Sequence, residues 1–229
     1  MAAHLPWVTL AAWLGTGLAV LGVLIDDNPD WRPLASAFAG LAGFLVYLLW
    51  YSHRPPPLAG IQRGMPLPAA ILDTVGDIDR LDTSAMPAPA LWCFFRGNWS
   101  PLCGGQVREL LALSSQLAGR GVQLVLISPQ PVKRTRALCR GAALQNVLLC
   151  QDRQLAFARR LGLVRTGGMP LLLRWFGFGR DMLHPTLMVT DADGDLVLLA
   201  QSDNERSRPD TGPVLKALER GVLRDSEGE

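Results

Sequence analysis

The sequence predicts an α/β domain with a largely parallel central sheet, preceded by two long apolar helices. Three observations support this prediction. The first fifty residues contain two uncharged apolar stretches of helical length, the next part alternates apolar runs with helical patterns, and a hairpin turn follows near the end. Alternating strands and helices are typical of a parallel sheet with helices on both faces.

Composition excludes several functional classes. The chain has 229 residues and a formal net charge of +2, without a basic stripe that would indicate a nucleic-acid partner. It has 4 cysteines, none at C-x-x-C spacing, and 3 scattered histidines. A disulfide-dense scaffold and a zinc site both need more than this. We therefore expect no nucleic acid, no metal and no cofactor.

The N-terminal region, residues 1–53, is predicted to form a transmembrane helical hairpin. Residues 7–25 and 33–51 carry no charge, and each is long enough to cross about 30 Å of hydrocarbon as a helix. A polar turn, residues 26–32, separates them. A cleaved signal peptide is disfavoured because no basic segment precedes the first stretch. A buried soluble hairpin is disfavoured because neither stretch has a polar face.

Charge near the two predicted spans indicates their orientation. The turn contains Asp26 and Asp27, whereas Arg54 and Arg63 follow the second span. The positive-inside rule then places the remaining chain in the cytoplasm, at a bacterial inner membrane. A periplasmic domain is the alternative. Membrane lipid and a membrane-protein partner are the partners expected for the hairpin.

The rest of the chain divides into a proline-rich linker (54–63), a domain (64–224) and a short tail (225–229). The strands expected from apolar runs are 90–95, 122–127, 147–149, 186–190 and 196–200. The first helix expected from apolar periodicity opens at Cys103 and ends before Gly119, and the others are 132–143, 154–161 and 211–222. Residues 191–195 are predicted to form a hairpin turn rather than a calcium-binding loop. A thioredoxin-like α/β fold satisfies this order.

Cys103 is the candidate working thiol. It follows the first expected core strand and opens the first expected domain helix, where free N–H groups and the helix dipole favour a thiolate. Arg96 and Arg108 are close enough in sequence to add positive charge, and Ser100 lies one turn earlier. The alternative is a buried inert cysteine, which is our interpretation of Cys93 within its apolar strand.

The segment F-F-R-G-N-W-S-P-L-C, residues 94–103, resembles the active-site segment of AhpC/TSA-type peroxiredoxins. It is most similar to the peroxiredoxin-like branch, which commonly has F-[FY]-R-G-x-W-C-P-x-C. Four further segments are similar to motifs of that family: residues 64–73, 126–129, 151–163 and 185–194. The resemblance implies a thioredoxin-like, peroxiredoxin-like fold.

The resemblance also implies roles for individual residues. Cys103 would be the peroxidatic thiol that attacks a hydroperoxide and becomes a sulfenic acid. Ser100 would contact the substrate or the thiolate. Cys139 would be a resolving thiol by analogy with atypical two-cysteine thiol peroxidases, and Cys150 is a weaker candidate. An external thiol such as thioredoxin would be the reductant.

Three departures from the family pattern affect these roles. Ser100 replaces the first cysteine of C-P-x-C, so exchange through a C-x-x-C pair is excluded. Arg96 stands where typical peroxiredoxins have proline. His184 stands where they have the catalytic arginine, a charge that Arg174 or Arg180 would have to replace.

Two further features lie next to this position in the sequence. Pro185, next to His184, resembles the cis-proline beside a thioredoxin active site. The apolar insertion 167–183 has three possible placements: on a membrane surface, against the sheet, or over the active site.

Three functions follow from these residues. The first is a membrane-anchored thiol peroxidase or related antioxidant oxidoreductase that acts through Cys103. The second is a thioredoxin-fold thiol-disulfide oxidoreductase or redox sensor that acts on a disulfide or cysteine of a partner protein. The third is a non-catalytic module that binds a membrane partner.

Overall fold

The structure is a computed structural model of the chain. It describes residues 5–25, 30–49, 56, 59–74, 80–86, 89–169, 174–175, 179–202 and 208–219. The chain divides into two compact units. One contains residues 1–55 and 203–207, and the other contains residues 56–202 and 208–229.

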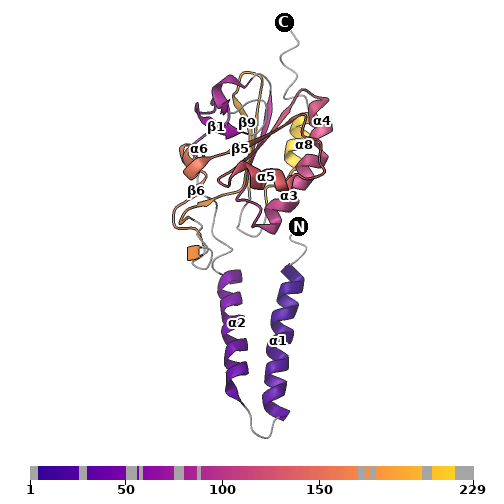
Figure 1. Cartoon of the computed structure of the whole chain (residues 1–229), viewed down its shortest axis with the longest axis vertical. Coiled ribbons are helices and arrows are strands. Elements are labelled where there is room, and N and C mark those ends of the chain that lie inside the picture. The colour runs from indigo at the N-terminus through magenta and orange to yellow at the C-terminus, as the bar shows by residue number, and fades with distance from the viewer. Residues whose placement is uncertain are drawn as a thin grey trace. The chain divides into compact units, whose positions relative to one another are not determined.

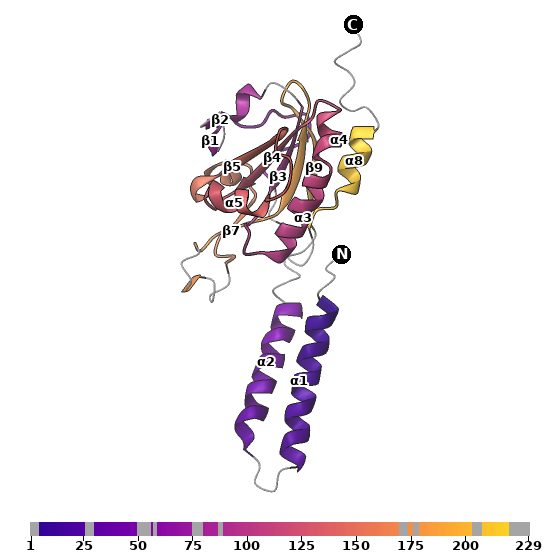
Figure 2. The ribbon, with the colours of Figure 1, turned by 45° about the vertical axis from the view of Figure 1, so that its right-hand side comes forward.

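The first unit contains two helices that lie side by side, α1 (Leu5–Ile25) and α2 (Trp31–Leu49) (Figures 1 and 2). The Asp30 carboxylate accepts a 3.1 Å hydrogen bond from Arg32 N and so caps the start of α2. The two predicted helices are therefore confirmed. No helix within the described residues has the length and apolarity required to cross a membrane. The transmembrane role of the pair stays a prediction.

The second unit contains a seven-stranded mixed sheet in the order β2-β1-β5-β4-β3-β8-β9. Its strands are β1 (Ile71–Thr74), β2 (Arg80–Asp82), β3 (Ala90–Phe94), β4 (Gln123–Ser128), β5 (Val147–Gln151), β8 (Thr186–Thr190) and β9 (Leu196–Gln201). β3, β4 and β5 are parallel to one another, whereas β8, β9, β1 and β2 join by antiparallel pairing. The sheet is therefore parallel only at its centre, less than we expected.

The helices of this unit are α3 (Pro101–Ala112), α4 (Ser114–Ala118), α5 (Val132–Leu138), α6 (Ala156–Arg160) and α8 (Gly212–Glu219). Short 3-10 turns cover Thr83–Ala85 (η2) and Arg153–Leu155 (η3), and a two-stranded sheet joins β6 (Val164–Arg165) to β7 (Met182–Leu183). Figure 2 shows α3, α4 and α8 along one side of the sheet.

Strand β3 lies in the interior of the sheet, between β4 and β8, and each of its side chains is apolar and buried. Alternate residues point to opposite faces. Leu91 and Cys93 face one hydrophobic cluster, which also receives side chains from α3, α4, α5 and α8. Trp92 and Phe94 face a second cluster, which contains the α6 residue Phe157. The sheet thus separates two cores.

The sequence failed to predict four short strands. β1 and β2 have only four and three residues, and β6 and β7 have two each. Such strands exist because of their pairing partners, so local periodicity contains little signal for them. The helix expected over 132–143 was also too long. It ends at Leu138, and Gly141 then adopts a φ of +83°.

The predicted hairpin at 191–195 is confirmed. Asp191 accepts hydrogen bonds through its side chain from Asp193 N (3.1 Å) and Asp195 N (2.9 Å). The carboxylate is therefore used to close the turn between β8 and β9. The segment that begins at Gly64 pairs with the start of β9, since Gly64 N donates to Leu196 O at 2.8 Å.

Candidate functional site

Cys103 lies in the first turn of α3, immediately beyond the loop that follows β3. Ser100 is the N-cap residue and Pro101 takes the first helical position, where proline's fixed φ suits the helix and its missing N–H costs nothing. This local sequence therefore starts the helix two residues before the thiol. The Cys103 side chain is fully buried (0% exposed) in the first cluster.

The Ser100 hydroxyl does not cap α3. Its Oγ instead accepts a 3.0 Å hydrogen bond from Nη2 of Arg208, a residue 108 positions later in the chain. Ser100 is 6% exposed, so this charge-assisted bond lies in a region largely shielded from water. Our sequence analysis did not identify Arg208. The structure brings this guanidinium to the start of the Cys103 helix.

Three contacts attach the segment containing Arg208 to α3. Besides the bond at Ser100, Gln106 Nε2 donates to Pro209 O at 3.3 Å, and Thr211 Oγ1 donates to the Glu109 carboxylate at 2.5 Å. Gln106 and Glu109 are three residues apart, on one side of the helix. The chain after β9 thus runs along α3 and delivers Arg208 to its first turn.

The electrostatics of Cys93 indicate that this cysteine lies near Cys103 and Arg208. Burial raises the pKa of the Cys93 thiol, the nearby Cys103 raises it further, and the Arg208 guanidinium acts in the opposite direction. Cys93, Cys103 and Arg208 are therefore close enough to interact. Cys93 is completely buried within β3, which agrees with our structural interpretation of it.

His184 occupies the position at which the family pattern has an arginine. It is 1% exposed, and its Nε2 lies 3.1 Å from Ser202 O. The pKa of His184 is lowered to about 4: burial is the main cause, the bond to Ser202 opposes it, and the positive charges of Arg96, Arg165 and Arg208 add to the lowering. The ring is therefore neutral at physiological pH. It cannot replace the missing cation.

The expectation of a cis peptide at Pro185 is wrong: the peptide bonds of the described residues contain no cis bond. The neighbouring residues explain this. His184 N donates to Leu163 O at 2.8 Å, and β7 ends only one residue before His184. Strand β8 then begins directly after Pro185. The extended chain runs from β7 into β8 with the trans bond that is normally preferred.

Arg96 lies in the loop between β3 and α3, but it is directed towards β7. Its Nε donates a 3.1 Å hydrogen bond to Leu183 O, and its side chain is largely buried. The same loop is attached to the β4–α5 connection because Asn98 N donates to the Gln130 amide oxygen at 3.0 Å. Gly97 makes this contact possible: its φ is +139°, and a Cβ would lie 2.8 Å from that oxygen.

Comparison with known proteins agrees with this arrangement. The sequence profile described as the AhpC/TSA family matches residues 67–198, more than half of the chain. The chain belongs to the AhpC/TSA family. This membership supports a thiol peroxidase or another thioredoxin-fold redox function. No curated protein gave a match.

Three solved structures show the shared fold of the AhpC/TSA domain. A cysteine-to-serine variant of peroxiredoxin 6 from Arenicola marina has 15% identity and a TM-score of 0.61, covering 73% of this chain and 76% of that one. Reduced Prx3 from Vibrio vulnificus in complex with hydrogen peroxide has 19% identity and a TM-score of 0.57, covering 69% and 99%. Yeast mitochondrial 1-Cys peroxiredoxin has 17% identity and a TM-score of 0.57, covering 73% and 79%. These likenesses confirm the predicted peroxiredoxin-like, thioredoxin-like fold.

The other two cysteines of the AhpC/TSA domain lie on opposite faces of the sheet. Cys139 ends α5 and shares the first cluster with Cys103, whereas Cys150 in β5 belongs to the second. A Cβ on Gly104 would lie 3.4 Å from Leu138 Cδ1, so the residues next to Cys103 and Cys139 approach each other. Burial raises the pKa of Cys139 to about 11 and that of Cys150 to about 12.

The described ends of insertion 167–183 meet beside the Cys103 loop. Gly167 N donates to the Asp181 carboxylate at 2.9 Å, and Met169 N donates to Arg180 O at 3.0 Å. Trp175 is exposed, as is Arg180, and Arg174 is half-buried. The predicted placement of residues 170–173 and 176–178 lies outside the described residues.

A cavity of about 550 Å³ opens at the carboxyl ends of β3, β4 and β5. Residues that follow these strands line it, together with both ends of the insertion. We name it the arginine pocket because its lining includes Arg96, Arg134, Arg159 and Arg180. Asp181 is the acidic member of the lining. Cys103 lies outside this lining, but Arg96 and Trp99 belong to the loop that leads to Cys103.

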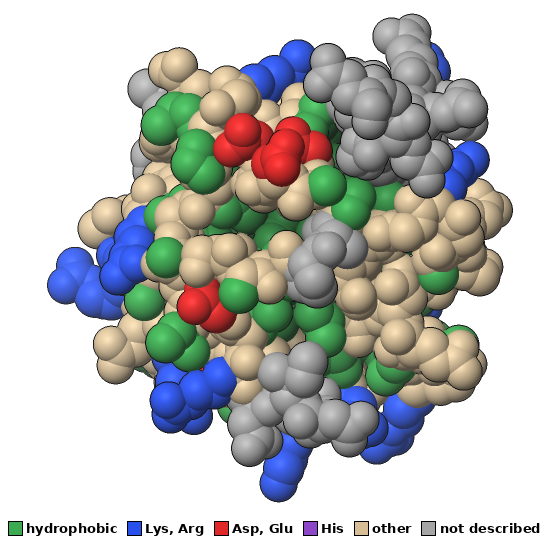
Figure 3. All heavy atoms as spheres, turned by 90° about the horizontal axis from the view of Figure 1, so that it is seen from above, with side chains coloured by type: hydrophobic (Ala, Val, Ile, Leu, Met, Phe, Trp, Pro, Cys, Tyr) green, Lys and Arg blue, Asp and Glu red, His purple; other side chains and the backbone are tan. Residues whose placement is uncertain are grey.

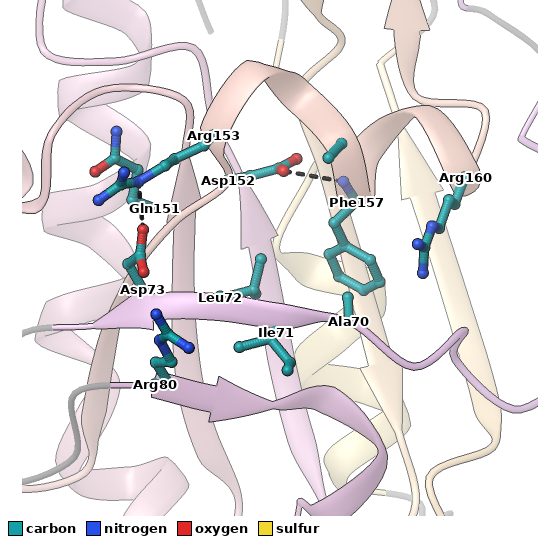
Figure 4. A pocket seen from close by; sticks show the side chains of 11 residues that line it. Ala70, Ile71, Leu72, Asp73, Arg80, Gln151, Asp152, Arg153, Phe157 and Arg160 are labelled. Atoms are coloured by element: carbon teal, nitrogen blue, oxygen red, sulfur yellow. Dashed lines mark hydrogen bonds and ion pairs between the residues drawn. The ribbon is translucent and has the colours of Figure 1, made fainter.

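A second cavity, of about 410 Å³, lies between β1 and the turn that follows β5 (Figure 4). Several of its charged groups have partners. Arg153 forms an ion pair with Asp73, and the buried Asp152 carboxylate accepts bonds from Phe157 N and Ala158 N, both at 2.9 Å. Asp152 thus caps α6. The second cavity shares no lining residue with the arginine pocket, and its side chains have structural roles.

The described side chains on one face of the molecule do not form the basic stripe of a nucleic-acid interface. Figure 3 shows the Lys and Arg side chains of one face distributed around its rim, with acidic side chains in two groups among neutral surface. A nucleic-acid interface needs basic side chains gathered along one groove or stripe. The absence of a nucleic-acid partner remains our expectation from composition.

Proposed function

We propose that the chain is a membrane-anchored thiol peroxidase that reduces hydroperoxides through Cys103. One observation carries the proposal: Arg208 donates to the N-cap Ser100 of the helix that contains Cys103 in its first turn. A cation beside a helix N-terminus can stabilise the negative charge that develops when a thiol there attacks a peroxide. Arg208 thereby provides the charge that His184 lacks.

The proposed reaction begins with local opening around the fully buried Cys103, whose thiolate then attacks the terminal oxygen of a hydroperoxide. The S–O bond forms as the O–O bond breaks, the sulfur becomes a sulfenic acid, and the released alkoxide takes up a proton and leaves as an alcohol. Negative charge develops on the leaving oxygen. Because the Ser100 oxygen already accepts from Arg208, its own O–H is available to donate to that oxygen.

The sulfenic acid would then be resolved by a second thiol. Condensation with Cys139 would form a disulfide and release water, and two electrons from an external dithiol such as thioredoxin would restore both thiols. Burial favours the neutral form of Cys139, so α5 must open locally before this thiol attacks. Direct attack by an external thiol is the other route. In yeast mitochondrial 1-Cys peroxiredoxin, the thiol-resolving mechanism uses the glutathione and thioredoxin systems.

Detection of the sulfenic acid tests the proposal. The reduced full-length chain would be treated with one equivalent of hydroperoxide in the presence of dimedone, and the adduct located by mass spectrometry. We expect labelling at Cys103 in the parent chain and none in Cys103→Ser. Labelling spread equally over several cysteines, or confined to Cys139 or Cys150, would contradict the proposal.

The second candidate function is thiol–disulfide exchange with a partner protein. Two observations disfavour this function: Cys103 is fully buried, and Ser100 replaces the first cysteine that a C-x-x-C oxidoreductase requires. The burial of Cys103 is instead compatible with the third candidate, a non-catalytic binding module. Mixed-disulfide trapping in a Cys139→Ser chain separates them: a stable adduct through Cys103 supports exchange, and an unreactive Cys103 supports the binding module.

Membrane anchoring is the second part of the proposal. The sequence of α1 contains no charged residue, and the two helices expose large apolar side chains. These include Leu10, Trp13, Leu14, Leu18, Leu21, Leu24, Phe38, Val46 and Leu49. Water does not favour so much apolar surface on a monomer. We propose that this surface contacts lipid at a bacterial inner membrane, with the domain on the cytoplasmic side.

Fractionation tests the location. We expect the chain to stay in the membrane pellet after an alkaline carbonate wash, and a chain beginning at residue 56 to enter the soluble fraction. Release of the full-length chain by the wash would contradict anchoring. Protease protection in spheroplasts would distinguish the cytoplasmic side from the periplasmic side.

A further inference from the structure

The position of the arginine pocket is typical of a ligand site. β3, β4 and β5 are parallel, and the pocket is lined by residues that follow each of them. In open α/β sheets, ligands bind beyond the carboxyl ends of the strands. Its volume of about 550 Å³ lies within the usual range for a small organic molecule.

The lining combines positive charge with an apolar wall. Arg159 is paired with Asp181, whose carboxylate also accepts from Gly167 N. Asp181 is the acidic residue of the described lining, so this ion pair neutralises Arg159 but not the other arginines. Arg134 and Arg180 are both exposed at this mouth, and the charge of Arg180 also helps to lower the pKa of Asp181. Trp99, Leu155 and Met169 supply apolar surface.

The backbone at the pocket is strained in a way that supports this interpretation. Gln154 and Leu155, consecutive lining residues, have φ values of 56° and 59°. Among the described residues they are the non-glycine residues with positive φ. The left-handed conformation costs about 1 kcal/mol or more for such residues, and strain of this kind gathers at ligand sites.

We propose that the arginine pocket binds the carboxylate of an amphiphilic organic hydroperoxide, such as a fatty-acid hydroperoxide, and presents it to the Cys103 loop. Arg134 and Arg180 bind the carboxylate, and Trp99 and Leu155 contact the apolar stem. The inference rests on the proposed function, because Cys103 performs the reduction. It adds a substrate class: hydroperoxides with an anionic head are preferred over neutral ones.

Binding is measured first, without chemistry. The probe is phenylbutyrate, added to the full-length Cys103→Ser chain in neutral detergent and followed by calorimetry. Arg134→Gln is compared with its matched control Arg136→Gln, an exposed arginine on the same helix that does not line the pocket. We expect affinity to fall at least threefold in Arg134→Gln, at least tenfold when Arg180→Gln is added, and to be unchanged in Arg136→Gln.

The methyl ester of phenylbutyrate should bind at least tenfold more weakly than the acid. Equal binding of acid and ester, or equal binding by the Arg134→Gln and Arg136→Gln chains, would overturn the carboxylate site. This readout does not depend on peroxidase activity. Its failure is therefore distinguishable from a failure of the proposed function.

The substrate class is tested by kinetics with Cys103 intact. Linoleic acid hydroperoxide and its methyl ester differ only in the charged head. We expect the acid to oxidise Cys103 at least tenfold faster, and Arg134→Gln with Arg180→Gln to remove the difference between acid and ester. Equal rates for acid and ester in the parent chain would overturn the assignment of substrate class.

Discussion

The two faces of the central sheet bury cysteines in different surroundings. On one face Cys103 lies at a helix start where Ser100 and Arg208 are bonded to each other. On the other face Cys150 lies in an apolar core. In the cavity near that core, Asp73 is paired with Arg153 and Asp152 accepts hydrogen bonds from the first turn of α6 (Figure 4). Burial alone therefore does not identify a working thiol: the difference lies in the polar groups that distant segments deliver.

The largest expected effect concerns stability on the second face. Phe157 is 1% exposed, and its ring centroid lies 5.8 Å from that of Phe94. Phe157→Ala should lower the free energy of unfolding by about 3–5 kcal/mol, because it removes buried surface and leaves a cavity. Denaturant unfolding of the full-length chain measures this. The oxidation rate of Cys103, measured well below the unfolding transition, should not change. A slowed rate would show that the two faces are coupled.

The next effect concerns chemistry on the first face. Arg208→Met should slow peroxide oxidation of Cys103 at least tenfold, about 1.4 kcal/mol, because the positive charge at Ser100 is lost. Arg208→Lys should recover part of the rate, and Arg120→Met, a change to an exposed arginine after α4, should have no effect. Stopped-flow fluorescence measures each rate. Oxidation of Arg208→Met at the parent rate would remove Arg208 from the site.

A smaller effect concerns pH. The pKa of His184 is lowered to about 4, below its ordinary value of about 6.5. The unfolded chain therefore binds a proton that the folded chain does not between these values, and stability should fall as pH decreases from about 6.5 to 4. In His184→Gln, that part of the decline should disappear. Unfolding midpoints at several pH values measure it; an unchanged acid dependence would contradict a buried neutral histidine.

The smallest effect concerns the ion pair of the second cavity. Arg153 is mostly exposed in its pair with Asp73. Pairs of this kind contribute about 0–1 kcal/mol, because water screens them. Asp73→Asn should accordingly change the free energy of unfolding by less than about 1 kcal/mol and leave Cys103 reactivity intact. A larger change would mean that the edge strand β1 depends on this pair.

Much of the fold was predictable from local sequence. The apolar run of β3 and the turn at 191–195 each have a local cause, and both were located correctly, whereas Ser100-Pro101 was assigned to the turn before the helix that it starts. β1 and β2 were not predicted, because only their pairing partners define them. The cis bond expected at Pro185 was wrong, because the sequence alone does not show how β7 leads into β8.

The candidate site was only partly predictable. Cys103 and Ser100 follow from a strand–turn–helix pattern, and the structure places them where that pattern requires. Arg208 had no local signal, because it is 108 residues from its partner in sequence and is brought there by the docking of residues 208–211 on α3. Arg134 and Arg180 of the arginine pocket likewise meet only through the topology of the sheet.

The most direct measurement is stopped-flow oxidation of the reduced full-length chain by hydrogen peroxide, with Cys103→Ser and Cys150→Ser as matched controls. We predict fast oxidation that is lost in Cys103→Ser and retained in Cys150→Ser, because the helix start and Arg208 activate only the first thiol. Oxidation no faster than that of an ordinary free thiol, or loss of the rate in Cys150→Ser alone, would contradict Cys103 as the peroxidatic residue.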